Sequence, residues 1–210
     1  MINILIVDDH AVVRDGIRKM FDGYPDVVTF GEAGTPPDAI RLASAQNWSI
    51  MILDLTLGDK SGLELLKDVK RVCPRLPVLI LSMHSEEQYA RRAFKAGASG
   101  FITKDCTSAA LLEAIKKVLQ GGRYVSPVLA EKLISDLRPD SDRALHETLS
   151  DREFEVMRLI ASGKTVGQIA ELLALSDKTI STYRARILTK LGMHTSAEIT
   201  HYAIQNKLTE

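Results

Sequence analysis

Short apolar runs that end on polar residues recur along the first half of the chain. The run Ile50-Met51-Ile52-Leu53 ends on Asp54, and the run Ile4-Leu5-Ile6-Val7 ends on Asp8 and Asp9. Continuous apolar runs of this length, bounded by turn residues, are typical of strands buried in a parallel sheet. Further runs of this kind cover 27–33, 78–81 and 100–103.

Amphipathic helical patterns separate these runs. The patterns cover about 12–21, 36–43, 63–69, 86–96 and 111–119, and Gly121-Gly122 closes the last of them. Strands that alternate with helices indicate βαβ units and a parallel sheet. The first 122 residues are therefore predicted to form an α/β domain, a flavodoxin-like (βα)5 doubly wound sheet.

The pattern changes after residue 122. Residues 123–144 indicate a short helix and then a polar, flexible tether, so we expect a linker there. Residues 145–210 carry four short helical patterns. The first begins at a capping box formed by Ser150 and Glu153, and the second begins at Val166. The third begins at Asp177 with Ser176 as its N-cap, and the fourth follows the N-cap Thr195. The second and third are joined by a tight turn, which predicts an all-α helix-turn-helix domain.

Composition narrows the class of protein only a little. The chain has 210 residues, 45% of them hydrophobic and 26% charged, with a formal net charge of zero, so bulk charge indicates no partner. Cys73 and Cys106 lack metal-like spacing, which favours a reducing compartment. The first residues are read as a strand and not as a signal peptide, and no apolar run reaches the roughly 20 residues of a membrane span. We expect a cytoplasmic protein with no membrane segment.

The predicted strands end on residues whose chemistry is complementary. Asp8 and Asp9 follow the first strand, Asp54 the third, Ser82 the fourth and Lys104 the fifth. In a parallel sheet these ends lie along one edge, where ligands bind. Close carboxylates repel each other unless a cation joins them, and hard oxygen donors suit Mg²⁺. With a lysine and a hydroxyl added, the set could hold a phosphoryl group on Asp54. Taken alone, Asp54 would more often be a strand-end residue that bonds loop amides.

Residues 1 to about 122 resemble the receiver domain of two-component response regulators. The resemblance is carried by Asp8-Asp9, Asp54 with Gly62 downstream, Ser82, the run Ala96-Gly97-Ala98-Ser99-Gly100, and Lys104. It implies that Asp54 is the phosphoacceptor and that Asp8, Asp9, Asp54 and the Thr56 carbonyl hold Mg²⁺.

The same resemblance assigns Phe101 to an aromatic switch position, although a core aromatic on a strand is the simpler interpretation of that residue. Gly58 and Asp105 depart from the family, which often has proline at both positions. His10 and His84 lie near the predicted edge, and we interpret them as surface residues in preference to metal ligands.

The helix predicted over 177–191 has a polar face opposite Ile180, Ile187 and Leu191. Ala185 lets that face approach a base closely, while Arg186 and Lys190 suit phosphates. The candidate DNA-contacting residues are Lys178, Thr179, Ser181, Thr182, Arg184, Ala185, Arg186 and Lys190. The alternative is a solvated polar face, because eight Lys/Arg and eight Asp/Glu from residue 145 onward leave the domain uncharged.

The stretch from Leu149 to about Ala203 is similar to the LuxR-type helix-turn-helix domain. The matching segments include Leu149-Ser150, Arg152-Glu153, Ile169-Ala170, Thr179-Ile180 and Lys190-Leu191-Gly192, while Tyr183 and Val166-Gly167 depart from it. Both halves together resemble a NarL/FixJ-type response regulator. This implies a DNA-binding transcription regulator, phosphorylated on Asp54 by a sensor histidine kinase, that binds a double-stranded operator as a homodimer.

Two other classes of protein stay open from the sequence. One is a flavodoxin-like hydrolase with Asp54 as nucleophile and Mg²⁺, which the lack of a second predicted acid or base beside Asp54 disfavours. The other is an interaction protein that kept the fold without being phosphorylated, which the complete acidic, serine and lysine set disfavours. We therefore expect no enzymatic activity.

Overall fold

The computed structural model describes residues 1–22, 28–57, 60–83, 86–127, 129–130, 144–206 and 208–209. The chain divides into two compact units, Met1–Leu137 and Arg138–Glu210. This division falls inside the segment 123–144 that the sequence analysis assigns to a linker. The short helix and the polar tether predicted there lie mostly outside the described residues, as do Gly58 and His84.

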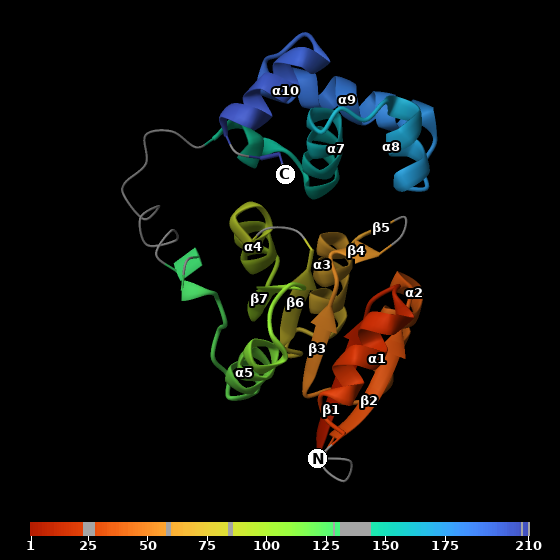
Figure 1. Cartoon of the computed structure of the whole chain (residues 1–210). Helices are drawn as coiled ribbons and strands as arrows, with labels where there is room; N and C mark the ends of the chain where they lie inside the picture. Colours follow the sequence, from red (N-terminus) through yellow and green to blue (C-terminus); the bar gives the residue numbers. More distant parts are fainter. Residues whose placement is uncertain are drawn as a thin grey trace. The chain divides into compact units, whose positions relative to one another are not determined.

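Within the described part of the first unit, five parallel strands form one sheet in the order β2-β1-β3-β6-β7. The strands are β1 (Ile2–Val7), β2 (Val28–Ala33), β3 (Ile50–Leu53), β6 (Val78–Ser82) and β7 (Gly100–Thr103). Every neighbouring pair is parallel, and the strand order reverses direction at β1 (Figure 1). The predicted doubly wound sheet is confirmed.

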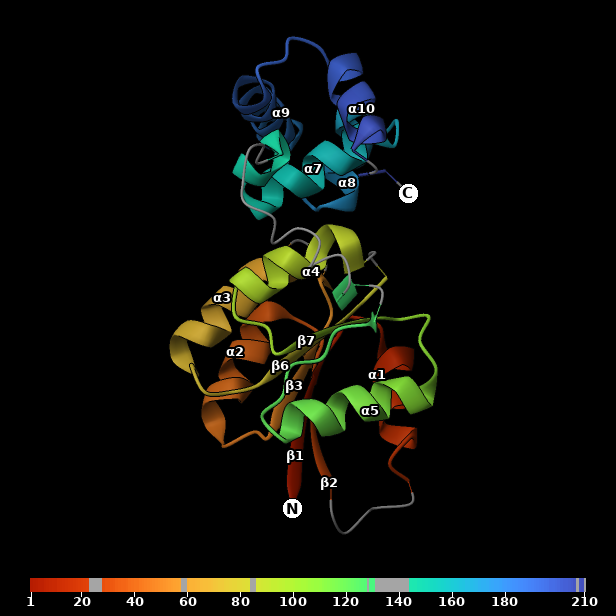
Figure 2. The same ribbon diagram turned by 90° about the vertical axis from the view of Figure 1, so that its left-hand side faces the viewer.

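Helices cover both faces of this sheet. They are α1 (Ala11–Lys19), α2 (Pro36–Ala45), α3 (Gly62–Val72), α4 (Glu86–Lys95) and α5 (Ser108–Leu119). Figure 2 shows α1 and α5 on one face and α2, α3 and α4 on the other. Because helices shield the central strands on both sides, those strands are apolar along their whole length, which explains the continuous runs in the sequence.

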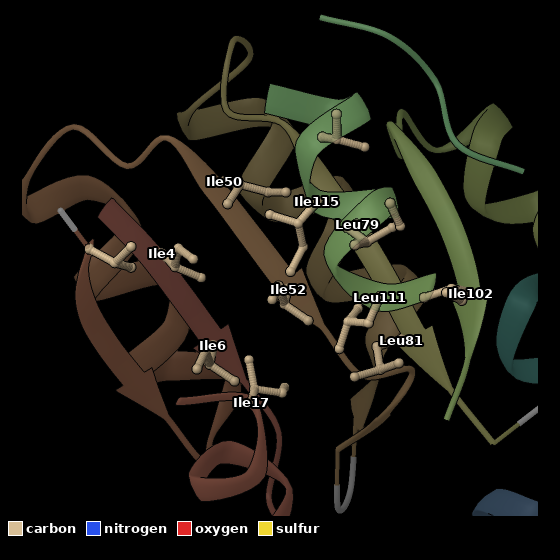
Figure 3. Close-up of a cluster of buried hydrophobic side chains, with 13 residues drawn as sticks. Ile4, Ile6, Ile17, Ile50, Ile52, Leu79, Leu81, Ile102, Leu111 and Ile115 are labelled. Carbon is tan, nitrogen blue, oxygen red and sulfur yellow. The ribbon is translucent and has the colours of Figure 1, made fainter. Parts of the chain in front are cut away.

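The core between the sheet and the α1 and α5 face is built from alternate strand residues. Side chains from all five strands of the sheet meet those of the two helices there (Figure 3). The residues labelled in that view are Ile4, Ile6, Ile17, Ile50, Ile52, Leu79, Leu81, Ile102, Leu111 and Ile115. All of these are nearly inaccessible to solvent, so burial of this layer contributes strongly to the stability of the unit.

The chain's only tryptophan belongs to this unit. The indole of Trp48 packs on Gly31 so closely that a Cβ placed there would lie 2.2 Å from the ring. Its Nε1 donates to the Leu42 carbonyl at 2.7 Å. Because these contacts exist only in the folded sheet, Trp48 fluorescence reports on the unfolding of the first unit alone.

A small hairpin follows β3 where only turn residues were expected. β4 (Thr56–Leu57) and β5 (Lys60–Ser61) pair antiparallel, with Thr56 opposite Ser61. Two-residue strands are too short to show an alternating pattern, so the sequence carried no signal for them.

Within its described residues, the second unit contains the four predicted helices and one element that was not predicted. The helices are α7 (Asp151–Ala161), α8 (Val166–Leu172), α9 (Asp177–Leu191) and α10 (Ser196–Gln205). A 3₁₀ helix, η1 (Leu145–Thr148), precedes them and is held by the Tyr202 hydroxyl, which accepts from the His146 N–H at 3.2 Å. The capping box of Ser150 and Glu153 is present as predicted.

The turns that end α7 and α8 have the same hydrogen-bond pattern but different residues. After α7, Gly163 has φ +82° and Lys164 N–H donates to the Leu159 carbonyl at 3.1 Å. After α8, Ala174 has φ +49° and Leu175 N–H donates to the Ala170 carbonyl at 2.9 Å. Both are Schellman endings, which place one residue in the left-handed region. Glycine fits that position without strain and alanine does not.

Among the helices of the described residues, none is long and apolar enough to cross a membrane.

Candidate functional site

Strand register brings the predicted site residues to one edge of the sheet. Val7 pairs with Leu53 in the parallel ladder, and the Asp54 N–H donates to the Val7 carbonyl at 2.9 Å. Ser82 pairs with Thr103, and the Lys104 N–H donates to the Ser82 carbonyl at 2.8 Å. These backbone hydrogen bonds hold Asp54, which follows β3, and Lys104, which follows β7, at the carboxyl edge of the sheet.

Three predicted site residues, Asp8, Asp9 and Asp54, cluster with His10 closely enough to share a cation, and these four residues are called the acidic pocket below. One ligand atom from each of Asp8, Asp9, His10 and Asp54 lies within 4.8 Å of the others. Asp8 and Asp54 are buried, whereas Asp9 and His10 are exposed. The pocket therefore offers carboxylate oxygens on one side and access for water on the other, which fits a cation that keeps part of its hydration shell.

Lys104 joins the two buried carboxylates. Its Nζ lies 2.7 Å from Asp8 Oδ2 and 2.7 Å from Asp54 Oδ2. Burial alone would lower the pKa of Lys104, but the ion pairs with Asp54 and Asp8 outweigh it, so the pKa is raised and the ammonium stays charged. The pocket therefore has a fixed positive charge beside Asp54.

The two oxygens of Asp54 have separate partners. Oδ1 accepts from the Thr56 N–H at 3.2 Å, and Oδ2 accepts from Lys104. Burial raises the pKa of Asp54, and the Asp8 charge adds to this, although the hydrogen bond and charge of Lys104 oppose it. The Asp54 carboxylate is partly desolvated and paired with the Lys104 ammonium, which is the kind of environment where functional groups occur.

Ser82 is the last residue of β6, and Phe101 is on the neighbouring strand β7. Both are completely buried. The Phe101 N–H donates to the Tyr124 carbonyl at 3.1 Å, and the Tyr124 N–H donates to the Ser99 carbonyl at the same distance, so the segment after α5 is bonded to β7. The buried ring of Phe101 is consistent with a core aromatic, and its switch role stays a prediction.

His10 lies at the acidic pocket and is also exposed at the surface. Its Nδ1 lies 2.8 Å from Asp9 Oδ1 and 3.3 Å from Asp8 Oδ1, and its side chain is 65% exposed. The sequence analysis treated this residue as a surface histidine. The structure adds that the imidazole belongs to the carboxylate cluster.

The backbone of Gly62 packs directly on that of the Asp54 loop. Its N–H donates to the Leu55 carbonyl at 2.8 Å. A Cβ at this position would lie 2.4 Å from the Asp54 carbonyl oxygen and 2.5 Å from Leu55 Cα. Backbone atoms cannot move aside as a flexible side chain can, so the position of Asp54 depends on the absence of a side chain at Gly62.

An ion-pair cluster beside the pocket was missed by the sequence analysis. Arg14 Nη1 donates to the Asp8 carbonyl at 2.7 Å, and Arg14 Nε donates to Glu32 Oε2 at 3.0 Å. Arg18 Nη1 donates to the second oxygen, Glu32 Oε1, at 2.9 Å. The hydrogen bond from Arg14 is the main cause that holds the pKa of Glu32 below its ordinary value. The signal in the sequence that could have indicated this cluster is Glu32, an acidic residue near the end of the strand predicted over 27–33.

In the second unit, α9 divides into the two faces that its sequence predicts. Ile180, Ile187 and Leu191 are buried. The exposed members of the candidate DNA-contacting set are Lys178, Ser181, Thr182, Ala185, Arg186 and Lys190.

Four of the candidate DNA-contacting residues have side-chain partners inside the domain, and one of them, Thr182, donates through Oγ1 to the Lys178 carbonyl at 2.9 Å. Arg184 Nε donates to Ser196 Oγ at 2.7 Å, and Thr179 Oγ1 lies 2.8 Å from Ser176 Oγ. Lys190 Nζ donates to Glu153 Oε2 at 2.6 Å. Their DNA contacts stay predictions, and a phosphate would have to compete with these partners.

Comparison with known proteins assigns each unit to a family. Residues 4–116 match the response regulator receiver domain, and residues 147–203 match the bacterial regulatory proteins of the luxR family. Both matched segments contain the residues described above, the acidic pocket in the first and α9 in the second.

Relatives extend over both units. The chain is 32% identical to the response regulator UvrY of Escherichia coli (strain K12), over 99% of this chain and 96% of that protein. It is 31% identical to the response regulator GacA of Pseudomonas aeruginosa, over 100% and 99%. The solved structure of RcsB from Salmonella enterica serovar Typhimurium, bound to promoter rprA with phosphomimetic BeF3-, aligns with a TM-score of 0.65 at 27% identity, over 96% and 97%.

Because this chain matches both family models and aligns with the relatives along nearly their whole length, it belongs to the NarL/FixJ-type response regulators of two-component systems, transcription regulators with a LuxR-type DNA-binding domain.

Proposed function

We propose that Asp54 accepts a phosphoryl group from a phosphohistidine of a sensor histidine kinase, or from a small phosphodonor. The observation that carries this proposal is the ammonium of Lys104, 2.7 Å from both Asp54 Oδ2 and Asp8 Oδ2 at the edge of the sheet. It is a preorganised positive charge at the place where phosphoryl oxygens would lie.

The transfer is an in-line displacement at phosphorus. A carboxylate oxygen of Asp54 attacks, the phosphorus–nitrogen bond of the phosphohistidine breaks, and an oxygen–phosphorus bond forms on Asp54. The imidazole leaves with the electron pair and takes up a proton. Lys104 stabilises negative charge on the phosphoryl oxygens, and Ser82 binds one of these oxygens in the product.

We propose that the acidic pocket also binds Mg²⁺. Asp8, Asp9 and Asp54, with the Thr56 carbonyl, would hold the ion, and the hard oxygen donors of the cluster fit this choice. When bound, Mg²⁺ would neutralise charge on the transferring phosphoryl group. Exposed Asp9 leaves space on the solvent side for the phosphodonor to enter.

Intact-mass measurement after treatment with acetyl phosphate tests the acceptor directly. The wild type should gain the mass of one phosphoryl group when Mg²⁺ is present, and Asp54→Asn should gain none. Asp105→Asn is a matched control, because this carboxylate follows Lys104 and instead accepts a hydrogen bond from the Thr103 hydroxyl. A phosphoryl gain that persists in Asp54→Asn would exclude Asp54 as the acceptor.

The second unit is proposed to bind double-stranded operator DNA through the exposed face of α9. Lys178 and Arg186 would contact phosphates, and Ser181, Thr182 and Ala185 would face base edges. The relative RcsB has been solved as a DNA complex, which supports the assignment. Substitutions at Thr182 should change which bases are preferred, by about 1–3 kcal/mol per contact. Thr182 variants with wild-type sequence preference would exclude this residue from base readout.

We further propose that phosphorylation promotes a homodimer and relieves masking of the DNA-binding domain by the receiver. A single helix-turn-helix makes few phosphate contacts, so tight binding calls for two copies on half-sites about one helical turn apart. Family resemblance points to α10 as the dimer surface, and its Ile204 is 59% exposed. RcsB dimers on DNA are a solved precedent among the relatives.

Light scattering and operator binding, each with and without beryllofluoride, test the dimer and the masking. Activation should raise both the molar mass and the operator affinity. The segment from Leu145 onward should bind the operator better than the unphosphorylated full chain. If activation changes neither quantity and the segment binds no better, the proposal is wrong.

The regulator assignment is proposed over the hydrolase alternative because the curated relatives are response regulators. The structure does bring one imidazole, His10, close to Asp54. A hydrolase would release many equivalents of phosphate from acetyl phosphate at a steady, enzyme-like rate, whereas a regulator takes up about one and stops. We place the protein in the cytoplasm, where Cys73 and Cys106 stay reduced.

A further inference from the structure

Arg14 connects three elements next to the acidic pocket. From α1 it donates through Nη1 to the Asp8 carbonyl at 2.7 Å and through Nε to Glu32 Oε2 at 3.0 Å. Its side chain is only 18% exposed. Asp8 directly follows β1, and Glu32 is on β2, the strand beside β1 in Figure 1. One planar group therefore joins α1, the end of β1 and β2.

Both backbone polar groups of Asp8 are hydrogen-bonded. The Asp8 N–H donates to the Ala33 carbonyl at 3.1 Å, and the Asp8 carbonyl accepts from Arg14. The carbonyl belongs to the peptide that joins Asp8 to Asp9, so Arg14 fixes the plane of that peptide. The direction in which both carboxylates leave the backbone follows from this plane.

We propose that Arg14 is a positioning residue that sets the cation affinity of the acidic pocket by holding the Asp8–Asp9 peptide. This inference rests on the proposed function of that pocket as an Mg²⁺ site. Partners behind the direct ligands orient them, and their loss typically weakens metal affinity about 10–100-fold. No contact between Arg14 and the cation is required.

The geometry needs arginine and not merely a positive charge. The guanidinium offers several donors in a fixed plane, so Nη1 and Nε can serve a carbonyl and a carboxylate at once. Lysine carries the same charge at a single flexible point and cannot hold both partners in one plane.

Arg18 provides a matched control from the same helix. It pairs with Glu32 at 2.9 Å and has the same charge. Within the described residues its ion pairs are with Glu32 and Asp15, and it makes no bond to Asp8. Arg18→Gln therefore removes the charge and the Glu32 ion pair but leaves the Asp8–Asp9 peptide held.

The test uses Mn²⁺ as the probe with the full chain, and the free ion is measured by electron paramagnetic resonance. Arg14→Gln and Arg14→Lys should each weaken Mn²⁺ binding by about tenfold or more. Arg18→Gln and Arg18→Lys should stay within about twofold of wild type, the uncertainty of such a titration. Glu32→Gln should weaken Mn²⁺ binding by an intermediate amount. It replaces the ion pair of Arg14 Nε with a weaker hydrogen bond, while Nη1 still donates to the Asp8 carbonyl.

Asp9→Asn separates failure of the inference from failure of the proposed function. If the wild type binds no Mn²⁺, or Asp9→Asn binds it as tightly as wild type, the cation site itself is wrong and the inference falls with it. If Asp9→Asn loses binding but Arg14→Lys keeps it, only the inference is overturned. Equal losses in Arg14→Gln and Arg18→Gln would assign the effect to charge and also overturn it.

Two further measurements separate positioning from general destabilisation. Trp48 fluorescence in urea, without metal, shows whether each variant is folded at the titration temperature. In metal-free protein, the Asp9 amide resonance should shift in Arg14→Lys and not in Arg18→Lys. If Arg14→Gln does not fold, Arg14→Lys and Glu32→Gln carry the same test, and wild-type affinity in both overturns the inference.

Discussion

Replacing Ala174 with glycine should stabilise the DNA-binding unit. Ala174 has φ +49°, and it is the one non-glycine residue with positive φ in the described part of the chain. It occupies the left-handed position of the Schellman ending of α8, in the turn that leads to α9. The hydrogen bonds of that ending, Leu175 to Ala170 and Ala174 to Glu171, involve only the backbone and are kept by glycine.

The expected gain in unfolding free energy is the difference between two effects, relief of backbone strain in the folded state and greater freedom of the unfolded chain. An L-residue in the left-handed region costs roughly 1–2 kcal/mol, which glycine does not. Glycine in turn gives the unfolded chain more freedom, which costs about 0.5–1 kcal/mol. The net gain is about 0.5–1 kcal/mol. In a domain of this size 1 kcal/mol corresponds to roughly 4–8 °C in the midpoint of thermal unfolding.

Gly163 provides the reverse substitution at an equivalent ending. It has φ +82° after α7, and a Cβ at this position would meet nothing within 4 Å. Gly163→Ala therefore introduces backbone strain without a steric clash. It should destabilise the same unit by about 1 kcal/mol, opposite in sign to Ala174→Gly.

Urea unfolding of the full chain measures both variants with an internal reference. Far-UV circular dichroism follows the helices of both units, whereas Trp48 fluorescence follows the first unit alone. The circular dichroism component of the second unit should move to higher urea in Ala174→Gly and to lower urea in Gly163→Ala, with the Trp48 transition unchanged. Loss of stability in Ala174→Gly would show that left-handed strain at this turn is not the governing term.

Three further outcomes are expected. Lys104→Met should destabilise the first unit by about 3 kcal/mol at neutral pH, because it leaves two buried carboxylates without their cation; an unchanged Trp48 urea midpoint would contradict this. Burial raises the pKa of Glu153, but the hydrogen bonds from Lys190 and Ser150 and the charge of Lys190 together outweigh burial, so this pKa is below its ordinary value of 4.5. Stability from this pair is therefore complete above pH 4.5 and is lost as the pH falls further, and Glu153→Gln should reduce that loss in pH-dependent circular dichroism melts. Arg186→Ala should lower the salt slope of operator binding by about 0.9, measured by fluorescence anisotropy, and an equal slope would exclude a phosphate contact.

Most of the fold and the three aspartates of the acidic pocket were predictable from sequence because both depend on strand ends. A parallel sheet aligns the carboxyl ends of its strands, so apolar runs that stop at Asp8, Asp54 and Ser82 specify one edge without any knowledge of side-chain packing. The β4–β5 hairpin was missed, because each of its strands has two residues and no periodicity.

Contacts between helices were less predictable than contacts at strand ends. Lys190 was interpreted as a phosphate contact, but its ammonium lies 2.6 Å from a carboxylate oxygen of Glu153, 37 residues earlier. Arg184 likewise reaches Ser196 on α10. Such pairs depend on the angle at which helices cross, which a pattern along one helix does not contain.

The close packing of Gly62 limits how this chain can vary during evolution. Residue 62 lies on a different element from Asp54 and carries no functional group, yet a single added carbon would lie 2.4 Å from the Asp54 carbonyl oxygen. The backbone of a residue eight positions earlier therefore excludes every side chain at position 62. The contact involves the backbone of residues 54 and 55, so it would remain if Asp54 were replaced by another residue. We therefore expect related chains that lack the aspartate to keep glycine at position 62 unless the loop conformation has also changed.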